Sequence, residues 1–192
     1  MGTKGENNRT RIIEAADQLF YKHGYNQTSF SDIADITGIP RGNFYYYFKT
    51  KDDILAAVVE ARVRQYQEAL LTCDDATENP AERLHAFIDI MAGSENSVVD
   101  TGCPIGSLCV ELAKDTEALQ SKSREVFVLL RDWMNSQFEE IGLVDANDKA
   151  MDLLSRMQGI AVIACAFKDS AYLHRSVGDL KNWINSLVTG RN

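Results

Sequence analysis

Apolar residues recur with helical spacing along most of the chain, and no stretch alternates between apolar and polar residues as a strand would. The first stripe, Ile12, Ala16, Leu19 and Phe20, predicts a helix from about residue 8 to residue 23, which Gly24 ends. Later stripes repeat this spacing almost to the C-terminus. The pattern therefore predicts an all-α fold of about nine helices.

The stretch Thr28–Lys51 (TSFSDIADITGIPRGNFYYYFKTK) predicts two short helices joined by a tight turn. Thr28 or Ser29 can cap the first helix, because a side-chain oxygen there accepts an unpaired backbone N–H. Gly38 lies where the chain must reverse, and Pro40 suits the first turn of the second helix. This arrangement is typical of a helix-turn-helix. The side chains expected to point inward are Phe30, Ile33, Ala34, Phe44, Tyr47 and Phe48.

A long helix is predicted from residue 51 or 52 to about residue 71, followed by a polar, turn-rich segment, Cys73–Pro80. We place a domain boundary there, which divides the chain into residues 1–51, 52–72 and 73–192. Further helices are expected up to about Ala92, over 104–112, 117–141, 146–170 and 177–188, with 93–102 as a loop. The expected organisation is an N-terminal three-helix head, a connecting helix and a C-terminal helical body.

The net charge of −8 argues at first against a nucleic-acid partner, but the charge is unevenly distributed. Residues 1–51 carry 7 basic and 5 acidic residues, whereas the remainder carries 13 and 23. An acidic body with a mildly basic head fits a protein that contacts DNA at one end. We expect no membrane span and no signal peptide, and therefore a cytoplasmic protein. The scattered cysteines and histidines predict no zinc site and no cofactor.

The helix-turn-helix stretch resembles the DNA-binding domain of TetR-family transcriptional regulators. The matching segments cover roughly the first quarter to third of the chain, and Pro40 departs from the capping serine often found in the family. The resemblance implies a dimeric regulator, most often a repressor, that binds double-stranded DNA at a near-palindromic operator. The matching residues are Ile12–Ile13, Ala15–Ala16, Leu19–Phe20, His23–Gly24–Tyr25, Thr28–Ser29–Phe30, Asp32–Ile33–Ala34, Gly38, Gly42–Asn43–Phe44–Tyr45, Tyr47–Phe48 and Lys51.

Candidate DNA contacts gather at the start of the second helix of this motif. Arg41 can bond guanine bidentately and Asn43 can bond adenine, while Gly42 leaves room for close approach to the groove. Both polar residues could instead be solvated surface residues, and Tyr45 or Tyr46 could belong to the core. The expected DNA-binding residues are Ser29, Ser31, Arg41, Gly42, Asn43, Tyr45, Tyr46 and Lys51.

Cys103 is the most distinctive residue of the body, because it precedes Pro104 at the start of a predicted helix, where the helix dipole favours a thiolate. Gly102-Cys103-Pro104-Ile105-Gly106 is similar to a Gly-Cys-x-x-Gly segment in a subset of TetR-like regulators, some of which respond to electrophiles or oxidants. The alternative is a small residue in a tight turn. The family also implies a cavity for a small apolar or electrophilic effector, although each candidate could equally be core. The candidates are Phe87, Met91, Leu108, Leu112, Val126, Leu130, Trp133, Met134 and Met157.

The last two helices carry broad apolar faces, which in isolation indicate core helices. The TetR resemblance implies instead that they pair with their copies in a four-helix dimer interface. The residues expected there are Leu153, Ile160, Ala164, Phe167, Leu180, Ile184 and Leu187.

An enzyme and an interaction adaptor are the two other classes of function to compare with the sequence. The sequence does not support an enzymatic function, because it shows no nucleophile–base pattern, phosphate loop or paired Glu-x-x-His motif. A helical interaction adaptor without sequence-specific DNA binding remains an alternative, which salt-dependent DNA binding would distinguish.

Overall fold

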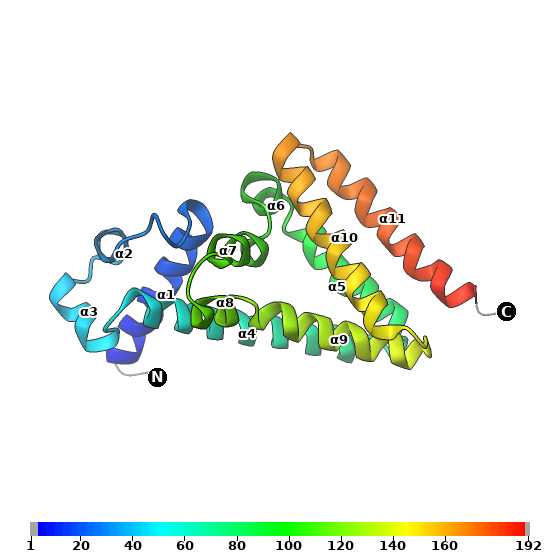
Figure 1. The fold of residues 1–192 in the computed structure, drawn as a ribbon, viewed down its shortest axis with the longest axis horizontal. Helices are drawn as coiled ribbons and strands as arrows, with labels where there is room; N and C mark the ends of the chain where they lie inside the picture. The colour runs from blue at the N-terminus through cyan, green and yellow to red at the C-terminus, as the bar shows by residue number, and fades with distance from the viewer. Residues whose placement is uncertain (1–3, 191–192) are drawn as a thin grey trace. The chain divides into compact units, whose positions relative to one another are not determined.

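The computed structural model describes residues 4–190, with the side chains of all of these except Lys4 and Arg41. The described residues form helices joined by short turns and loops and contain no strand, which confirms the all-α prediction (Figure 1). The chain folds into two compact units. The first unit runs to Arg64 and includes Pro104–Val126, and the second contains Gln65–Cys103 and the chain from Phe127. The helices are α1 Lys4–His23, α2 Phe30–Thr37, α3 Arg41–Tyr47, α4 Lys51–Ala76, α5 Pro80–Gly93, α6 Glu95–Thr101, α7 Pro104–Leu112, α8 Glu117–Ser123, α9 Glu125–Ile141, α10 Ala146–Phe167 and α11 Ser170–Thr189.

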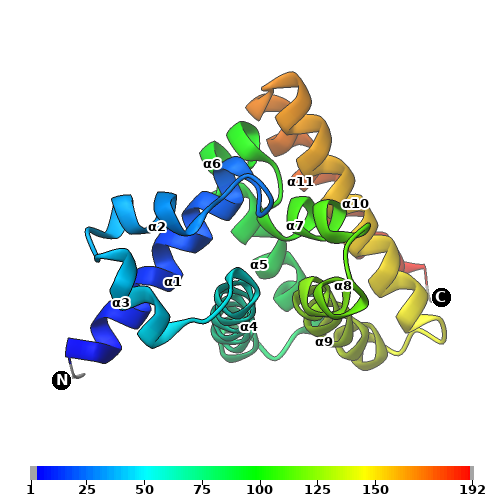
Figure 2. The same cartoon turned by 60° about the vertical axis from the view of Figure 1, so that its left-hand side comes forward.

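In the first unit, α1, α2 and α3 pack around a common apolar core (Figure 2). Ile12, Ile33 and Phe44, one from each helix, are at most 1% exposed. Gly38 ends α2 in the left-handed region (φ 64°), and its N–H donates to the Ala34 carbonyl. The predicted turn is therefore confirmed, and it fixes the angle between α2 and α3.

The caps of the head differ in detail from the prediction. Ser29 is the N-cap of α2 and forms a capping box with Asp32. Thr28 is buried instead, and its hydroxyl donates to the Gly24 carbonyl. Pro40 is the N-cap of α3 rather than a residue of its first turn, and it makes no side-chain cap bond. Because Pro40 lacks a capping oxygen, the Ser29–Asp32 pair provides the side-chain cap of the motif.

In the second unit, α5, α6, α10 and α11 pack against one another. Polar contacts link α11 to its neighbours: Lys181 forms an ion pair with Asp89 of α5 at 2.5 Å, and His174 Nε2 lies 2.9 Å from Glu95 Oε2 of α6. The hydrogen bond from His174 lowers the pKa of the Glu95 carboxyl below its ordinary value. Lys168, the C-cap of α10, has a positive φ of 52°. The second unit is thus a helical body held by polar links as well as apolar packing.

Several helix bounds differ from the prediction. The loop expected over 93–102 contains α6, and the Lys168 ammonium donates to the carbonyls of Val99 and Asp100 near its C-terminus. The helix expected over 117–141 breaks at Arg124 into α8 and α9. Helix α4 continues to Ala76, and Cys73, expected in a polar turn, is buried within it.

Helix α10 is long and apolar enough, by length and composition, to cross a membrane, which the sequence analysis did not anticipate. A core helix of a globular protein meets the same criteria. Leu153 and Ala164 of this helix are fully buried in the protein. One such helix is therefore weak evidence for a membrane span.

Candidate functional site

The exposed side of α3 carries polar and aromatic side chains above a buried base. Phe44 is 1% exposed, whereas Tyr46 is 91% exposed and Asn43 is also exposed. The Tyr45 ring stacks on Phe30, with centroids 6.0 Å apart and an interplanar angle of 16°. A rigid core thus presents one amide and two phenol side chains outward from one short helix.

The other predicted DNA contacts of the motif lie at the starts of α2 and α3. Gly42 and Ser29 are exposed, Ser31 is half-buried, and the Arg41 side chain lies outside the described residues. The Ser29 hydroxyl is engaged with Asp32, whose pKa is lowered first by the bond from the Ser29 backbone N–H and then by the Ser29 hydroxyl. The cap therefore orients Ser29 at the N-terminus of α2.

Tyr47 differs from its predicted inward position, because it is half-buried and pairs with the Asn8 side chain (3.3 Å). Phe30 is likewise half-buried rather than core. Aromatic spacing alone does not separate a buried ring from one at the edge of the core.

The turn between α1 and α2 (residues 24–29, the α1–α2 turn) is held from two sides. Glu111 of α7 accepts from the backbone N–H groups of Tyr25 and Asn26, at 2.8 and 2.7 Å. Lys51 at the start of α4 donates to the carbonyls of Tyr25 (2.9 Å) and Thr28 (3.1 Å). Sequence reasoning missed Glu111, although it is the single charged residue of the segment PIGSLCVEL.

The predicted effector-pocket residues do not all belong to one unit. In the second unit, Phe87, Leu130, Met134 and Met157 are buried, while Met91 and Trp133 are half-buried. The rings of Phe87 and Trp133 lie 5.5 Å apart, and Trp133 Nε1 donates to Asp74. The buried residues Leu108, Leu112 and Val126 belong to the first unit.

Cys103 is half-buried and directly precedes α7. The neighbouring thiol of Cys165 lies 3.8 Å from the position of a Cβ on Gly102, and Lys168 Nζ lies 3.9 Å from its sulfur. Cys109 Sγ donates to the Ser123 carbonyl, and burial raises the pKa of the Cys73 thiol. Within the described residues, no cluster of three or more histidine, cysteine or acidic side chains could hold a metal ion.

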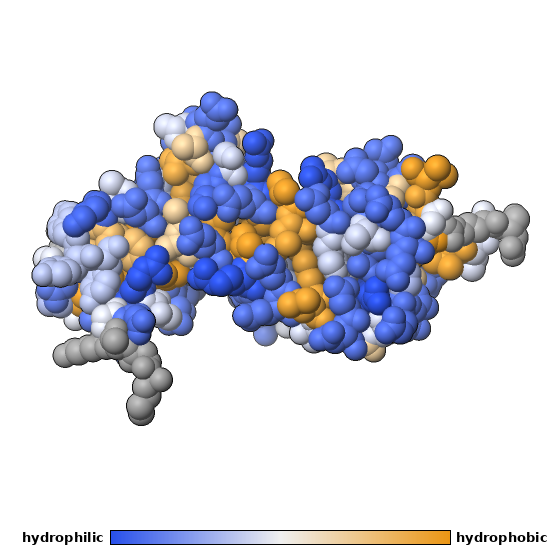
Figure 3. Space-filling model, turned by 90° about the horizontal axis from the view of Figure 1, so that it is seen from below, coloured by the Kyte–Doolittle hydropathy of each residue, from blue (hydrophilic) through white to orange (hydrophobic). Residues whose placement is uncertain are grey.

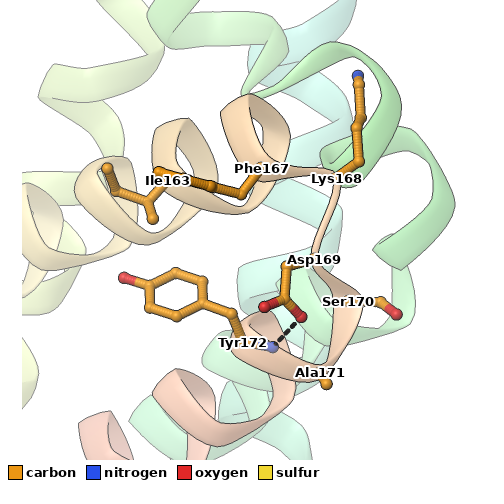
Figure 4. Close-up of a pocket in the computed structure, with 7 residues that line it drawn as sticks. All are labelled: Ile163, Phe167, Lys168, Asp169, Ser170, Ala171 and Tyr172. Atoms are coloured by element: carbon orange, nitrogen blue, oxygen red, sulfur yellow. Dashed lines mark hydrogen bonds between the residues drawn. The ribbon is translucent and has the colours of Figure 1, made fainter.

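A groove follows the contact between α10 and α11. Its first part, about 590 Å³, lies where α10 turns into α11. Figure 4 shows the Tyr172 ring of α11 beneath Ile163 of α10, with the Lys168 side chain pointing away from them. The Asp169 carboxylate accepts a hydrogen bond from the Tyr172 backbone N–H. A second part of about 330 Å³ shares Ile163 and Tyr172 and extends along both helices, past Gly159 and Leu180. The two parts therefore adjoin at Ile163 and Tyr172.

Exposed apolar side chains border this groove. Val162, Ile163 and Phe167 of α10 are 60%, 40% and 75% exposed, whereas Leu153 and Ala164 of the same helix are buried. Nothing lies within 4 Å of the position of a Cβ on Gly159, so the surface there is open to a close approach. On the face drawn in Figure 3, hydrophobic atoms gather in limited patches on a mostly hydrophilic surface, one of them at the C-terminal end of α11.

Residues 12–58 match the family model of bacterial regulatory proteins of the tetR family, and residues 80–178 match that of the C-terminal domain of LmrA/YxaF-like transcriptional regulators. The second match alone spans more than half of the chain. The chain belongs to the TetR family of transcriptional regulators. The resemblance inferred from the helix-turn-helix residues is thereby confirmed.

Individual relatives agree with this assignment. An HTH-type transcriptional regulator encoded in the lacX 3′ region of Lactococcus lactis is 34% identical over 63% of each chain, and LmrA of Bacillus subtilis is 29% identical over 69% of each. The aligned region thus spans about two thirds of these relatives. A TetR-family regulator from Agrobacterium tumefaciens has the same fold, with a TM-score of 0.85 at 21% identity over 93% of this chain and 98% of that one. The TetR family consists of DNA-binding transcriptional regulators rather than enzymes.

In this TetR-family chain, most residues predicted for the dimer interface are already buried within a single protomer. Leu187 is half-buried, and Phe167 alone of the predicted set is exposed. A side chain that is buried in its own chain offers no surface to a partner. The buried members of the predicted set are Leu153, Ile160, Ala164, Leu180 and Ile184.

The environment of Tyr25, in the α1–α2 turn of the head, predicts that the protein becomes less stable at alkaline pH. Its hydroxyl donates to Asp52, and burial first, then this bond, raises the pKa of Tyr25 above its ordinary value near 10. Because the folded-state pKa is the higher one, this contribution to stability is present below pH about 10 and is lost as pH rises above it. We expect the melting temperature to fall above pH about 10, and to fall less steeply for Tyr25→Phe.

Thermal melts of Tyr25→Phe and of Tyr46→Phe, a control at an exposed position of the same head, measure this effect. The Tyr46 variant should keep the wild-type profile. Parallel alkaline profiles for wild type and Tyr25→Phe would contradict the assignment.

Proposed function

We propose that this protein is a repressor that binds a near-palindromic operator as a dimer and leaves it when an effector acts on the C-terminal body. The observation that carries the proposal is the rigidly based α3 surface, with Asn43, Tyr45 and Tyr46 exposed over a buried Phe44. A recognition helix presents its base-contacting residues in this way. We expect a cytoplasmic protein that acts on double-stranded DNA.

Salt-dependent DNA binding tests this proposal. The full chain is titrated into a DNA fragment from upstream of its own coding region, and into a shuffled fragment of equal length, at several salt concentrations. Affinity for the first fragment should be higher and should fall steeply with salt, because phosphate contacts release counterions. Equal, salt-insensitive binding to both fragments would support the adaptor alternative instead.

For assembly, we propose that a second copy docks on the groove between α10 and α11. The lining of the groove mixes apolar residues with charged ones, among them Arg156, Lys168, Asp169 and Asp179. Phe167 of this lining and Val162 of the same helix remain exposed, although burial of such side chains is favourable. A twofold axis would place the same helices of the partner against it, as in a four-helix bundle. The surface that meets the partner is then Gly159, Val162, Ile163, Ala166 and Phe167, together with the end of α11.

For the effector, we propose a small apolar or electrophilic molecule that acts on the body. The aromatic pair Phe87–Trp133 and the buried Met134 and Met157 supply apolar, adaptable walls for such a ligand. Binding that rearranges these side chains would act on the head through α4, which has residues in both units.

A thiol response is the sharper form of this effector hypothesis. We expect Cys103, at the start of α7, to react faster with electrophiles than Cys73, Cys109 or Cys165, and its adducts to release DNA. Low-dose alkylation followed by mass-spectrometric mapping ranks the four thiols, and Cys103→Ser tests the release. Since Lys168 lies beside Cys165, Cys165→Ser is the matched control.

The relative reactivity of the four thiols decides between a thiol switch at Cys103 and reversible binding of a ligand. Faster labelling of Cys165, or continued release of DNA from alkylated Cys103→Ser protein, would exclude a switch at Cys103. Reversible ligand binding would then remain as the proposed route of induction.

A further inference from the structure

The carboxylate of Glu111 spans two consecutive amides of the α1–α2 turn. Its Oε2 accepts from the Tyr25 N–H and its Oε1 from the Asn26 N–H, so both oxygens are used. Bonds to an ionised carboxylate are among the stronger hydrogen bonds in proteins. The residue before them, Gly24, has φ 87°, and a Cβ there would lie 3.0 Å from Glu111 Oε2. The turn is therefore shaped to receive this side chain closely.

The opposite edge of the same turn is also occupied. The Thr28 hydroxyl donates to the Gly24 carbonyl at 2.7 Å, and Lys51 donates to the carbonyls of Tyr25 and Thr28. The next residue, Ser29, caps α2, so the turn leads without a spacer into the helix-turn-helix. A displacement of Glu111 would accordingly displace the start of α2, and α3 follows α2 through the fixed turn at Gly38.

The helix that carries Glu111 has an unusual place in the chain. The segment Pro104–Val126 packs with the head in the first unit, but Cys103 before it and Phe127 after it both belong to the second unit. Chain continuity therefore ties both ends of this segment to the body. The side chains of Ile105, Leu108 and Leu112 anchor α7 by burial, which leaves Glu111 as its charged contact to the head.

We propose that Glu111 is a positioning residue for operator binding, which couples α7 to the helix-turn-helix through the backbone of the α1–α2 turn. The inference rests on the proposed DNA-binding function and assigns one of its links to a named side chain. Coupling between sites requires such a contiguous physical connection, and it is reciprocal. A change in α7 alters DNA binding, and DNA binding alters the hydrogen exchange of α7.

Electrostatics and positioning predict opposite effects for the variant Glu111→Gln. Removal of a negative charge from the head should by itself tighten binding to the DNA polyanion. Loss of the carboxylate clamp should weaken binding by roughly tenfold, since a bond to a charged group is removed and an amide group then faces a backbone N–H. Glu14→Gln is the matched control, because Glu14 is an exposed residue of α1 in the same unit.

The experiment uses the full chain and the DNA fragment from upstream of its own coding region. Binding is titrated for wild type, Glu111→Gln and Glu14→Gln, and amide hydrogen exchange is followed with and without DNA. We expect weaker binding and faster exchange at Tyr25 and Asn26 in Glu111→Gln alone. In wild type and Glu14→Gln, added DNA should slow exchange in both the α1–α2 turn and α7, whereas in Glu111→Gln the response of α7 should be lost.

Each other outcome has a definite meaning. Binding by Glu111→Gln that equals or exceeds that of Glu14→Gln overturns the proposal, as does an unchanged α7 response. If Glu111→Gln does not fold, wild-type exchange decides: an α7 that does not respond to DNA overturns the proposal. If the wild-type protein binds no DNA, the proposed function is overturned instead. The role of Glu111 can then still be tested in the DNA-free protein, where rapid amide exchange at Tyr25 and Asn26 would contradict its hydrogen bonds to the α1–α2 turn.

Discussion

Replacement of Phe167 by aspartate is expected to give a folded monomer with weak operator binding. Phe167 is 75% exposed in one protomer, so a charge there costs little in the isolated chain. At a twofold interface the change occurs twice, and each lost phenyl burial removes about 1.5–3 kcal/mol. The dimer dissociation constant should therefore rise at least about a hundredfold. Sedimentation velocity over a range of concentrations measures this rise.

Two comparisons separate assembly from folding. Val144→Asp introduces the same charge at a fully exposed position between α9 and α10, and it should leave the dimer intact. Ile160→Asp and Ile184→Asp should unfold the chain, because these side chains are 8% and 0% exposed within one protomer. A wild-type-like dimer from Phe167→Asp would refute docking on this groove. A folded monomer from Val144→Asp would indicate that the dimer interface includes the turn between α9 and α10 instead.

The head was predictable from sequence in its core and in its main turn. Spacing identified Ile33, Ala34, Phe44 and Phe48 as inward positions, and all four are buried. The left-handed conformation of Gly38 follows from local chemistry, because glycine alone adopts it without a steric cost. Local patterns suffice where the determining contacts lie within one or two turns of helix.

The features that sequence reasoning missed depend on contacts between distant residues. Helix α6 lacks a strong apolar stripe, and Lys168, nearly 70 residues later, supplies donors to its last carbonyls. Glu111 meets amides more than 80 residues earlier. The burial of Ile160 and Leu180 within one protomer, rather than between two, likewise depends on how α10 and α11 pack. A periodic stripe shows that a face is buried, but not what buries it.

Loss of the Asn43 side chain is expected to weaken operator binding by about 1–3 kcal/mol and to relax the preference at one base position. Asn43 is exposed in the first turn of α3, and its backbone N–H donates to the Pro40 carbonyl, so the side chain is oriented by a bonded backbone. An amide can bond adenine bidentately from such a position. Arg41→Ala should have an effect of the same size at another base. Competition binding with single-base operator variants measures both.

The control variants distinguish the loss of a base contact from the loss of a phosphate contact and from a loss of stability. Asn147→Ala makes the same change on the exposed start of α10 and should leave affinity unchanged. Lys51→Ala should weaken binding to all sequences alike and flatten the salt dependence. It should also lower the melting temperature, because two carbonyls of the α1–α2 turn lose their donor. If Asn43→Ala and Arg41→Ala both bind the operator as tightly as wild type, with unchanged base preference, α3 is not the recognition helix.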